Sequence, residues 1–293
     1  MNAITDSFVP MQRINRWNGI IFLTSINLVT FLILPVYICY FKVHASEIAL
    51  FVFYVLATSF SITMGYHRFF AHSTFKAGPV MEFLLLFFGA ATFEGSALKW
   101  SSFHRRHHQY TDTELDPHNI KKGFFFAHMG WILFWKHAPN YDNVKDLQKM
   151  VLVIHQHRHY QAWAIVSGVI LPLLVGALTG HMFGAFLWSV VVRMTFVFHS
   201  AFFINSFAHT FGSRPYDRHS SAKDNWLGAL LTNGEGYHNF HHRFPQDYRN
   251  GIRWYHWDPT KWMIWSLSRV GMVRNLRRTS IAQIIQARLA PQG

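Results

Sequence analysis

The segment IALFVFYVLATSFSITMGYHRFFAH, residues 48–72, joins an apolar run of membrane-spanning length to a pair of histidines. Its first 19 residues, Ile48 to Tyr66, carry no charged side chain, and a helix of about 20 apolar residues crosses a bilayer. His67 and His72 follow directly. Because neutral imidazole is the commonest protein ligand for transition metals, this segment predicts an integral membrane protein with a metal site at one membrane surface.

The composition of the whole chain agrees with a membrane protein. Of the 293 residues, 51% are hydrophobic and only 14% are charged, whereas an ordinary soluble domain carries about 25% charged residues. The net charge of +13 is assigned to the cytoplasmic membrane face, where positive residues collect, and not to nucleic acid. The single cysteine, Cys39, lies in an apolar run, which excludes a disulfide framework and a cysteine-ligated cluster or zinc site.

Four apolar segments are long enough to span a bilayer, and short connections pair them into two hairpins. We predict spans at residues 17–41, 48–66, 160–180 and 182–204. Arg13, Arg16, Arg68 and Lys76 flank the first hairpin on one side, which the positive-inside rule makes cytoplasmic. Residues 67–159 and 205–293 then form a cytoplasmic helical cap, and the chain is a single domain over residues 1–293.

One apolar segment is too short to span. Phe83 to Phe93 has 11 residues and is bracketed by Glu82 and Glu94, and a carboxylate in hydrocarbon costs several kcal/mol. We predict a re-entrant or interfacial helix here. Asp258-Pro259 is a helix-start signature, and the tryptophans around it, such as Trp254 and Trp262, are typical of the membrane–water interface. The predicted fold is therefore all-α, with four spans, this extra helix and the cap.

Nine histidines fall into four groups, and the two hairpins place every group on the cytoplasmic side. The groups are His67 and His72; His104, His107 and His108; His209; and His238, His241 and His242. One metal ion takes about four to six ligands. Nine histidines on one face therefore predict two metals held close together.

The spacing within the groups indicates how the imidazoles meet. In His-x-x-His-His, positions i, i+3 and i+4 share one helix face, so we expect the three rings to converge. His67 and His72 would be about 140° apart on a continuous α-helix, so the helix must end or distort between them. Asn205 lies one turn before His209, and we expect it to be a weak ligand, through water.

Carboxylates near the histidines are expected to orient the imidazoles through their second ring nitrogen. We assign this role to Asp112, Asp116 and Glu235, with Glu94 as a further candidate. Arg193 lies near the centre of the last span, where an arginine is costly and needs a partner. Glu82 or Glu94 is the expected partner, and packing against protein is the alternative.

The histidine groups resemble the histidine boxes of membrane fatty acyl desaturases, with the closest likeness to the stearoyl-CoA Δ9 desaturase group. The boxes are HRFFAH at 67–72, HRRHH at 104–108, NSFAH at 205–209 and GEGYHNFHH at 234–242. The connecting pieces DPHN at 116–119, GFFFAH at 123–128 and RPYD at 214–217 match as well. The resemblance covers roughly residues 45 to 265 and is specific, because four boxes agree in type, order and spacing.

This resemblance implies a four-span bundle with a cap that encloses a di-iron centre (Fe2+/Fe3+). It implies an enzyme that uses O2 and two electrons to form a cis double bond, at Δ9, in a saturated acyl chain. Trp100 falls where the family places a tunnel tryptophan. Lys121 and Lys122 stand where relatives carry a basic pair, and they could meet phosphates as point charges.

The position before the second box departs from the animal members of the family. They carry Arg-Asp there, a pair associated with the CoA headgroup, whereas this chain has Ser102 and Phe103. Acyl-CoA is the expected substrate, and acyl chains on phospholipid or carrier protein are the alternatives. No His-Pro-Gly-Gly haem motif is present, so we expect a separate electron donor: ferredoxin, rubredoxin, or cytochrome b5 with its reductase. The compact chain favours a bacterial inner membrane over the endoplasmic reticulum.

Two other functions are consistent with grouped histidines. A di-iron alkane or lipid hydroxylase could use the same oxidant to return OH to the carbon, but such enzymes resemble His-x-x-x-His patterns with spacings that differ from those here. A metal transporter or sensor would need polar residues across the membrane, and the first three spans are nearly free of ionisable groups.

Overall fold

The computed structural model describes residues 16–135 and 138–290, and about 68% of the chain is helical. Arg13, used above for the membrane orientation, lies outside these residues. The membrane part comprises α1 (Arg16–Leu28), η1 (Val29–Ile33), α2 (Leu34–Tyr40), α3 (Ala45–Phe60), η2 (Ser61–Ala71), α8 (Tyr160–Ile165), η7 (Val166–Ile170), α9 (Leu171–Leu178), α10 (Met182–Ala185), η8 (Phe186–Val192) and α11 (Arg193–Thr210). The cap comprises β1 (Lys76–Ala77), α4 (Pro79–Ala90), α5 (Ala97–Tyr110), η3 (Ile120–Lys122), η4 (Phe126–Gly130), α6 (Trp131–Phe134), η5 (Tyr141–Val144), η6 (Leu147–Lys149), α7 (Val151–Arg158), α12 (Trp226–Leu231), α13 (His238–Arg243), α14 (Pro259–Arg269), β2 (Val273–Arg274) and α15 (Ile281–Leu289).

Among the described residues, four continuous helices are long and apolar enough to cross a membrane, which confirms the predicted multi-pass fold. They are Trp17–Tyr40, Ala45–Ala71, Tyr160–Leu178 and Met182–Thr210. The second and fourth continue past their predicted ends at Tyr66 and Ile204. Each extension carries a histidine, His67 or His209, so the spanning helices themselves bring two of the candidate ligands to the cap.

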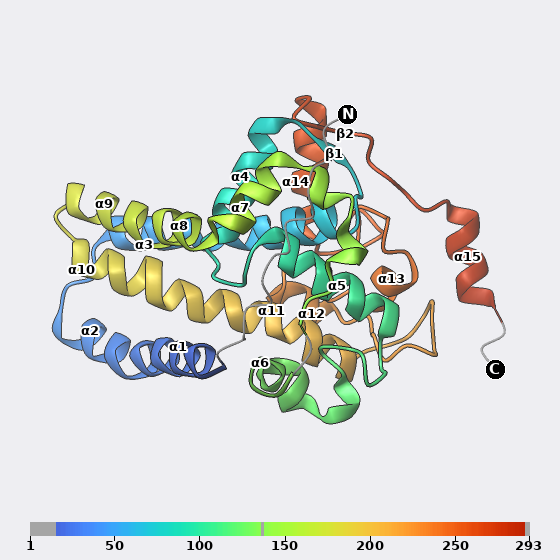
Figure 1. Ribbon diagram of the computed structural model, residues 1–293, viewed down its shortest axis with the longest axis horizontal. Coiled ribbons are helices and arrows are strands. Elements are labelled where there is room, and N and C mark those ends of the chain that lie inside the picture. Colours follow the sequence, from blue (N-terminus) through green and yellow to red (C-terminus); the bar gives the residue numbers. More distant parts are fainter. Residues whose placement is uncertain (1–15, 136–137, 291–293) are drawn as a thin grey trace, which may run out of the picture.

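The four spans pack as two hairpins whose connecting loops lie at the same end of the bundle, opposite the cap (Figure 1). Polar contacts join the hairpins inside the bundle. Thr30 and Thr195 share a hydrogen bond of 2.8 Å between their hydroxyls, and Tyr54 donates to the carbonyl of Ser167 at 3.0 Å. These contacts satisfy polar groups that would otherwise be costly in hydrocarbon.

Arg193 is fully buried, and the prediction that it pairs with Glu82 or Glu94 is wrong. Its guanidinium donates to three backbone carbonyls, those of Ser189, Gly168 and Ala91, and lies 5.6 Å from the centre of the Tyr54 ring. Ala91 follows α4, so the arginine ties the short apolar helix to two spans. Packing against protein, the alternative considered above, accounts for this residue.

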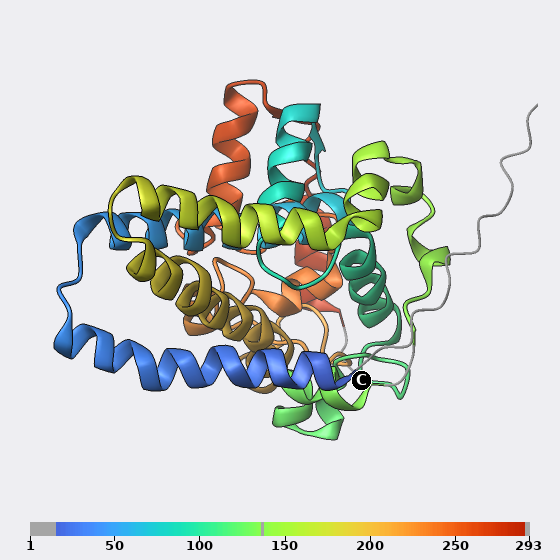
Figure 2. The same cartoon turned by 60° about the vertical axis from the view of Figure 1, so that its left-hand side comes forward.

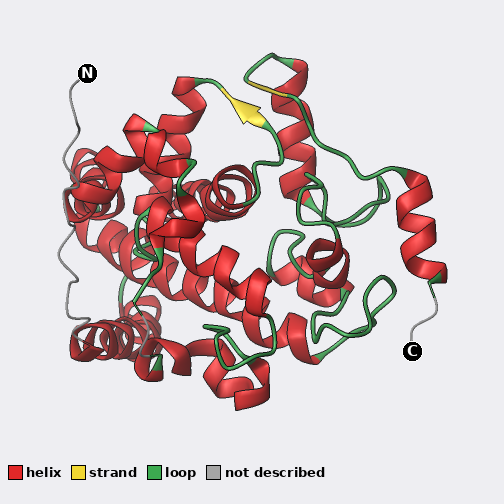
Figure 3. Cartoon of the chain, turned by 45° about the vertical axis from the view of Figure 1, so that its right-hand side comes forward, coloured by secondary structure: helices red, strands yellow, loops and turns green. Residues whose placement is uncertain are grey.

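The short apolar helix α4 runs across the long axes of the spanning helices, as expected for an interfacial element (Figure 2). An antiparallel pair of two-residue strands, β1 before α4 and β2 after α14, joins these two helices, with Lys76 opposite Arg274 (Figure 3). Both helices leave apolar side chains exposed, including Val80 and Phe83 on α4 and Trp262 and Trp265 on α14. Such exposed apolar and tryptophan side chains suit headgroup depth.

Candidate metal centre

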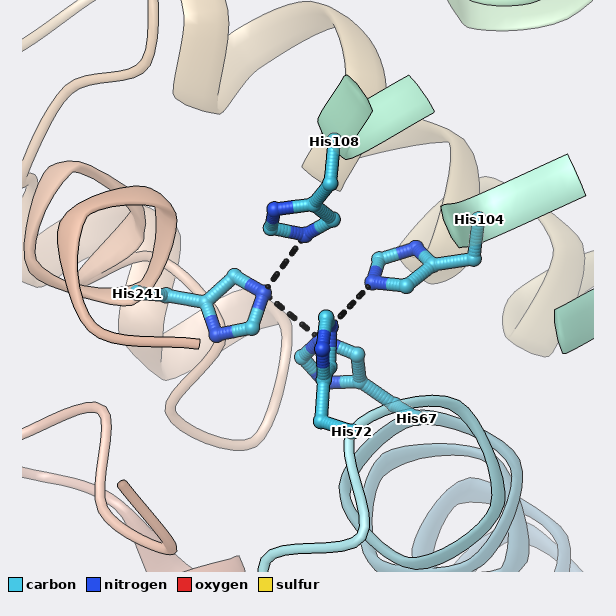
Figure 4. Close-up of side chains that lie close together, drawn as sticks. All are labelled: His67, His72, His104, His108 and His241. Atoms are coloured by element: carbon cyan, nitrogen blue, oxygen red, sulfur yellow. Dashed lines mark hydrogen bonds between the residues drawn. The ribbon is translucent and has the colours of Figure 1, made fainter. Parts of the chain in front are cut away.

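All nine grouped histidines meet at the cap end of the bundle, where they form two adjacent sets. The first set is His67, His72, His104, His108 and His241, and the second is His107, His209, His238 and His242. Within each set the ligand nitrogens lie within 4.8 Å of one another. The five rings of the first set come from three elements and point toward one another (Figure 4). Each set could hold one metal ion.

The two His-x-x-His-His triplets divide between the sets, which corrects the expectation that each triplet converges. On α5, His104 and His108 enter the first set, whereas His107 enters the second. On α13 the pattern is reversed, because His241 enters the first set while His238 and His242 enter the second. Residues i and i+4 stay together in both cases, and the residue between them reaches the other set. Each of the two helices thus contributes to both sets, and the sets lie side by side, with the rings of His108 and His242 stacked across them at 4.3 Å between centroids.

The predicted distortion between His67 and His72 takes the form of a π-helix. Segment η2 is wound with i to i+5 hydrogen bonds, and the backbone N–H of His72 donates to the carbonyl of His67 at 3.1 Å. Residues five apart therefore share a face, and the two rings lie 5.0 Å apart between centroids. On a continuous α-helix these two residues would be about 140° apart, and the wider π-helix brings them to the same side.

The ring nitrogens of each set are arranged for a cation. His67 Nε2 lies 2.9 Å from His241 Nε2, which in turn lies 2.9 Å from His108 Nε2. His67 Nδ1 faces a carboxylate of Glu235 at 2.9 Å, so it carries the ring proton and its Nε2 presents a lone pair. His209 Nε2 is buried without a hydrogen-bond partner among the described residues. Closely spaced ring nitrogens in a buried site, one of them without a hydrogen-bond partner among the described residues, are the arrangement expected around a metal ion.

Burial keeps most of these imidazoles neutral, which is the form that binds metal. In five of the histidines the pKa lies well below the usual histidine value, first because they are buried and second because a charge on one ring would repel charges on its neighbours. These five are His72, His104, His108, His241 and His242. For the same reasons the pKa of His238 falls to about 3. The donor set, all imidazole nitrogen, suits redox-active iron as well as zinc or copper.

Asp116 and Glu235 each place a carboxylate oxygen beside the outer ring nitrogen of one grouped histidine. Asp116 Oδ1 lies 2.8 Å from His107 Nδ1, and Glu235 contacts His67 Nδ1 as described. Burial alone would raise the pKa of Glu235, but His67 and the guanidinium of Arg68 lower it to about 2. Each set therefore has one histidine whose outer nitrogen is held by a buried carboxylate, an arrangement that fixes the tautomer and the ring plane.

Arg68 plays a part that the sequence reasoning missed. The sequence indicates only that it is one of the positive residues flanking the first hairpin, yet its side chain is buried and donates to Glu235, Asp258 and the carbonyl of Tyr248 at 2.8–3.2 Å. Asp258 is the N-cap of α14, as the sequence predicted. The guanidinium thus links α14 to the carboxylate that holds His67. Its place directly after a ligand histidine was the only available signal.

Asp112 differs from the expectation, because its carboxylate touches no ligand histidine in the described structure. It accepts a hydrogen bond from the backbone N–H of Ser221 at 2.8 Å, and the Ser221 hydroxyl lies 2.6 Å from His209 Nδ1. Ser221, which has no motif around it, therefore holds the outer nitrogen of His209. Asp112 acts one step further out, by fixing the loop that carries Ser221.

A cavity of about 390 Å³ lies against both histidine sets. Its polar wall includes His67, His104, His107 and His238, and its other walls are mainly apolar, with side chains such as Phe22 and Phe198. Trp100 lines the cavity as predicted, stacks on His104 with 4.9 Å between centroids and donates to Glu94 Oε2 at 3.1 Å. Burial raises the pKa of Glu94 to about 7. Glu94 therefore serves the cavity wall, and its predicted contacts with a histidine or with Arg193 are absent among the described residues.

The remaining site candidates lie at different distances from the cavity. Asn205 lines it, one helical turn before His209. Phe103 also lines it, whereas Ser102 is buried and donates to the carbonyl of Asn140 at 2.8 Å. Lys121 and Lys122 lie in η3 on the surface, where Lys122 pairs with Glu114 at 2.8 Å, and neither lines the cavity.

The fold and the site define a class: a multi-pass membrane protein with a histidine-built centre for two metals beside an apolar cavity. Comparison with known proteins identifies the family. The family model described as "Fatty acid desaturase" matches residues 46–272, and the chain belongs to that family.

Three relatives illustrate the range of similarity. The probable acyl-CoA desaturase of Schizosaccharomyces pombe is 44% identical over 228 residues, covering 77% of this chain and 48% of the relative. Acyl-CoA desaturase 1 of Saccharomyces cerevisiae is 37% identical over 284 residues, covering 94% and 55%. The sn-1 stearoyl-lipid 9-desaturase of Synechocystis is 34% identical over 265 residues, covering 89% and 80%. The chain thus spans about half the length of the two yeast relatives.

Proposed function

We propose that this protein is an O2-dependent fatty acyl desaturase that introduces a cis double bond, at Δ9, into a saturated acyl chain carried by CoA. The observation that carries the proposal is the contact between the two histidine sets and the apolar cavity. The names of the yeast relatives support acyl-CoA as the substrate, and the name of the Synechocystis relative supports Δ9.

The reaction removes two hydrogens from adjacent methylenes: –CH2–CH2– + O2 + 2 e⁻ + 2 H⁺ gives –CH=CH– + 2 H2O. An unactivated methylene has no acidity for a general base to use, so an oxidant is needed; that oxidant is O2, which the two iron ions would activate when bound. The nine histidines would hold them, five at one position and four at the other, with Asn205 completing the second through water. Asp116 and Glu235 would fix His107 and His67, and Asp112 would act through Ser221.

The cavity supplies selectivity. Its apolar walls bury the acyl chain and exclude water, and holding one C–H pair beside the histidine sets is proximity catalysis. Trp100, stacked on His104, forms a rigid part of the wall next to the centre. Lys121 and Lys122 lie outside the cavity, so in this proposal they meet the headgroup phosphates at the protein surface.

Two electrons per turnover come from a separate donor protein of the ferredoxin, rubredoxin or cytochrome b5 type. The excess positive charge favours docking of an acidic partner. By the positive-inside rule the histidine end of the bundle faces the cytoplasm. A bacterial inner membrane stays the preferred location from the sequence, although the relatives come from both yeasts and a cyanobacterium.

The test is a product analysis of the full-length, iron-loaded protein in lipid nanodiscs. Stearoyl-CoA, O2 and reduced ferredoxin with its reductase are supplied, and the products are identified by mass spectrometry with double-bond localisation. We expect oleoyl product from the wild type and none from His241→Ala, with His219→Ala, a change of an exposed histidine, as the matched control. A hydroxylated product without olefin would overturn the desaturase proposal in favour of a hydroxylase. Turnover of stearoyl-phosphatidylcholine but not of stearoyl-CoA would overturn the proposal that the acyl chain is carried by CoA, and it would leave the proposal of desaturation intact.

A further inference from the structure

A third cluster of metal-binding side chains lies at the opposite end of the bundle from the nine histidines. His44, Glu47 and His181 each place one ligand atom within 4.8 Å of the others. His44 lies in the loop between α2 and α3, and His181 in the loop between α9 and α10. These loops are the turns of the two hairpins, which lie together at the end away from the cap (Figure 1). We propose that these three residues form a binding site for a divalent transition-metal ion of the Zn2+ class.

The two imidazoles are free to bind. Their rings stack with 3.6 Å between centroids and 17° between planes, so their nitrogens lie side by side at the rim of the bundle. Both residues are only half-buried, and within residues 16–135 and 138–290 no hydrogen bond engages their ring nitrogens. A stack of two imidazoles with unused nitrogens leaves both lone pairs available to an ion arriving from the aqueous phase.

Glu47 supplies the charge that makes a cation favourable. Its side chain is 2% exposed, and no lysine or arginine in the described part of the chain pairs with it. A buried carboxylate without a cation is costly. It lies in the first turn of α3. The tyrosine hydroxyl of Tyr37 lies 3.0 and 3.1 Å from its two oxygens.

The surroundings hold this carboxylate in place. A Cβ added at Gly184, on α10, would collide with the Glu47 carboxyl group, so the glycine leaves room for the carboxylate in its present position. The second hairpin therefore provides both His181 and the space for Glu47. Tyr37 orients the carboxylate from the first hairpin, in the way that outer hydrogen bonds orient metal ligands.

The donor set indicates the class of ion. Two imidazoles and one carboxylate are a common set for Zn2+ with a fourth position left for water. Calcium and magnesium favour sites made wholly of oxygen. Because His44 and Glu47 belong to the first hairpin and His181 to the second, a bound ion would fasten the hairpins at the end where no cap holds them. This role is independent of acyl desaturation and of the ions bound by the nine histidines.

The first test counts metal ions. The iron-loaded protein in detergent is incubated with ZnCl2 and desalted, and zinc and iron are measured together by mass spectrometry. We expect one zinc per chain beyond the iron in the wild type and in His219→Ala, and loss of that zinc in His44→Ala and His181→Ala with iron unchanged. Equal zinc in the wild type and both variants would overturn the site, because the zinc would then reside elsewhere.

The second test uses variants that keep side-chain volume, in case the alanine variants fold poorly. Tyr37→Phe removes only the hydroxyl that orients Glu47, and we expect zinc to bind about 10–100-fold more weakly. Glu47→Gln should weaken binding at least as much. In the wild type ZnCl2 should also raise the unfolding temperature, with no rise in Glu47→Gln. Unchanged zinc affinity in both variants would overturn the proposal.

The third test concerns the side of the membrane. In sealed right-side-out vesicles, a membrane-impermeant chelator should remove this zinc while the iron stays bound. In inside-out vesicles the zinc should be protected. Removal from inside-out vesicles alone would place the zinc at the histidine end of the bundle and overturn the assignment to His44 and His181.

Discussion

The imidazoles of His104 and His107 leave the same turn of α5 but enter different histidine sets. His104 Nε2 lies 2.8 Å from His72 Nε2, whereas His107 Nε2 lies 3.3 Å from His242 Nε2. A single helical motif therefore contributes to both histidine sets, and in the proposed function the removal of either histidine should affect one metal position first.

We expect His104→Ala and His242→Ala each to lower bound iron from two ions per chain toward one and to abolish product formation. The ions lost should differ, because the two residues belong to different sets. Metal analysis together with Mössbauer spectroscopy of 57Fe-loaded protein measures this, with His219→Ala as a control that keeps both ions. Loss of the same iron signal in both variants would contradict the five-and-four division.

Asp116→Asn should weaken iron binding about 10–100-fold. The amide keeps the shape of the side chain but removes the negative charge that faces His107 Nδ1 at 2.8 Å. Equilibrium competition with an iron chelator measures the affinity. Asp142→Asn is the matched control, since the Asp142 side chain is 78% exposed and its ion pair is with Lys145, at 3.7 Å. Equal affinities in the two variants would show that Asp116 does not orient its histidine.

Arg68→Met should lower the free energy of unfolding by about 3–5 kcal/mol, the cost of leaving buried charges without their partner. Glu235 and Asp258 would both lose the guanidinium, and both are buried. Chemical unfolding in detergent measures the change. Lys145→Met removes a lysine that is 71% exposed and 3.7 Å from Asp142, and such surface pairs contribute about 0–1 kcal/mol. A similar small effect of both changes would contradict the role given to Arg68.

Ala201→Phe should shift the preferred substrate toward shorter acyl chains. Ala201 lines the cavity among apolar side chains of α1 and α11, such as Leu23 and Phe202, so a phenyl ring there would occupy space that a long chain needs. Competition among myristoyl-, palmitoyl- and stearoyl-CoA measures the preference. Phe196→Leu, at an exposed position on the same helix, should leave the preference unchanged. An unaltered ratio in Ala201→Phe would place the acyl chain elsewhere.

The spans and the ligand histidines could be predicted from the sequence because each leaves a local signal. A charge-free run such as Ile48 to Tyr66 has few alternatives to a membrane helix, and repeated His-x-x-His-His spacing is rare by chance. The division of the ligands could not be predicted, because spacing along one helix does not say which neighbour each ring faces. His107 and His108 are adjacent in sequence yet serve different sets.

The contacts of residues that bind backbone groups could not be predicted from the sequence, for a different reason. Arg193 satisfies its guanidinium with carbonyls of three separate elements, and every residue has a carbonyl, so no pattern marks the partner. Ser221 holds His209 from a loop whose path depends on Asp112. Asp112 itself has a backbone φ of 65°, in the left-handed region, which its residue type does not make predictable from the sequence.

The π-helical segment Ser61–Ala71 makes the metal centre depend on chain length as well as on side-chain type. Each residue of a helix is rotated about the axis relative to the one before it, so a one-residue deletion just before His67 would turn that ring away from Glu235 and Trp100 while leaving every histidine chemically intact. Substitutions within the segment keep the register, but insertions and deletions do not. We therefore expect residues 61–71 to accept many substitutions but neither insertions nor deletions.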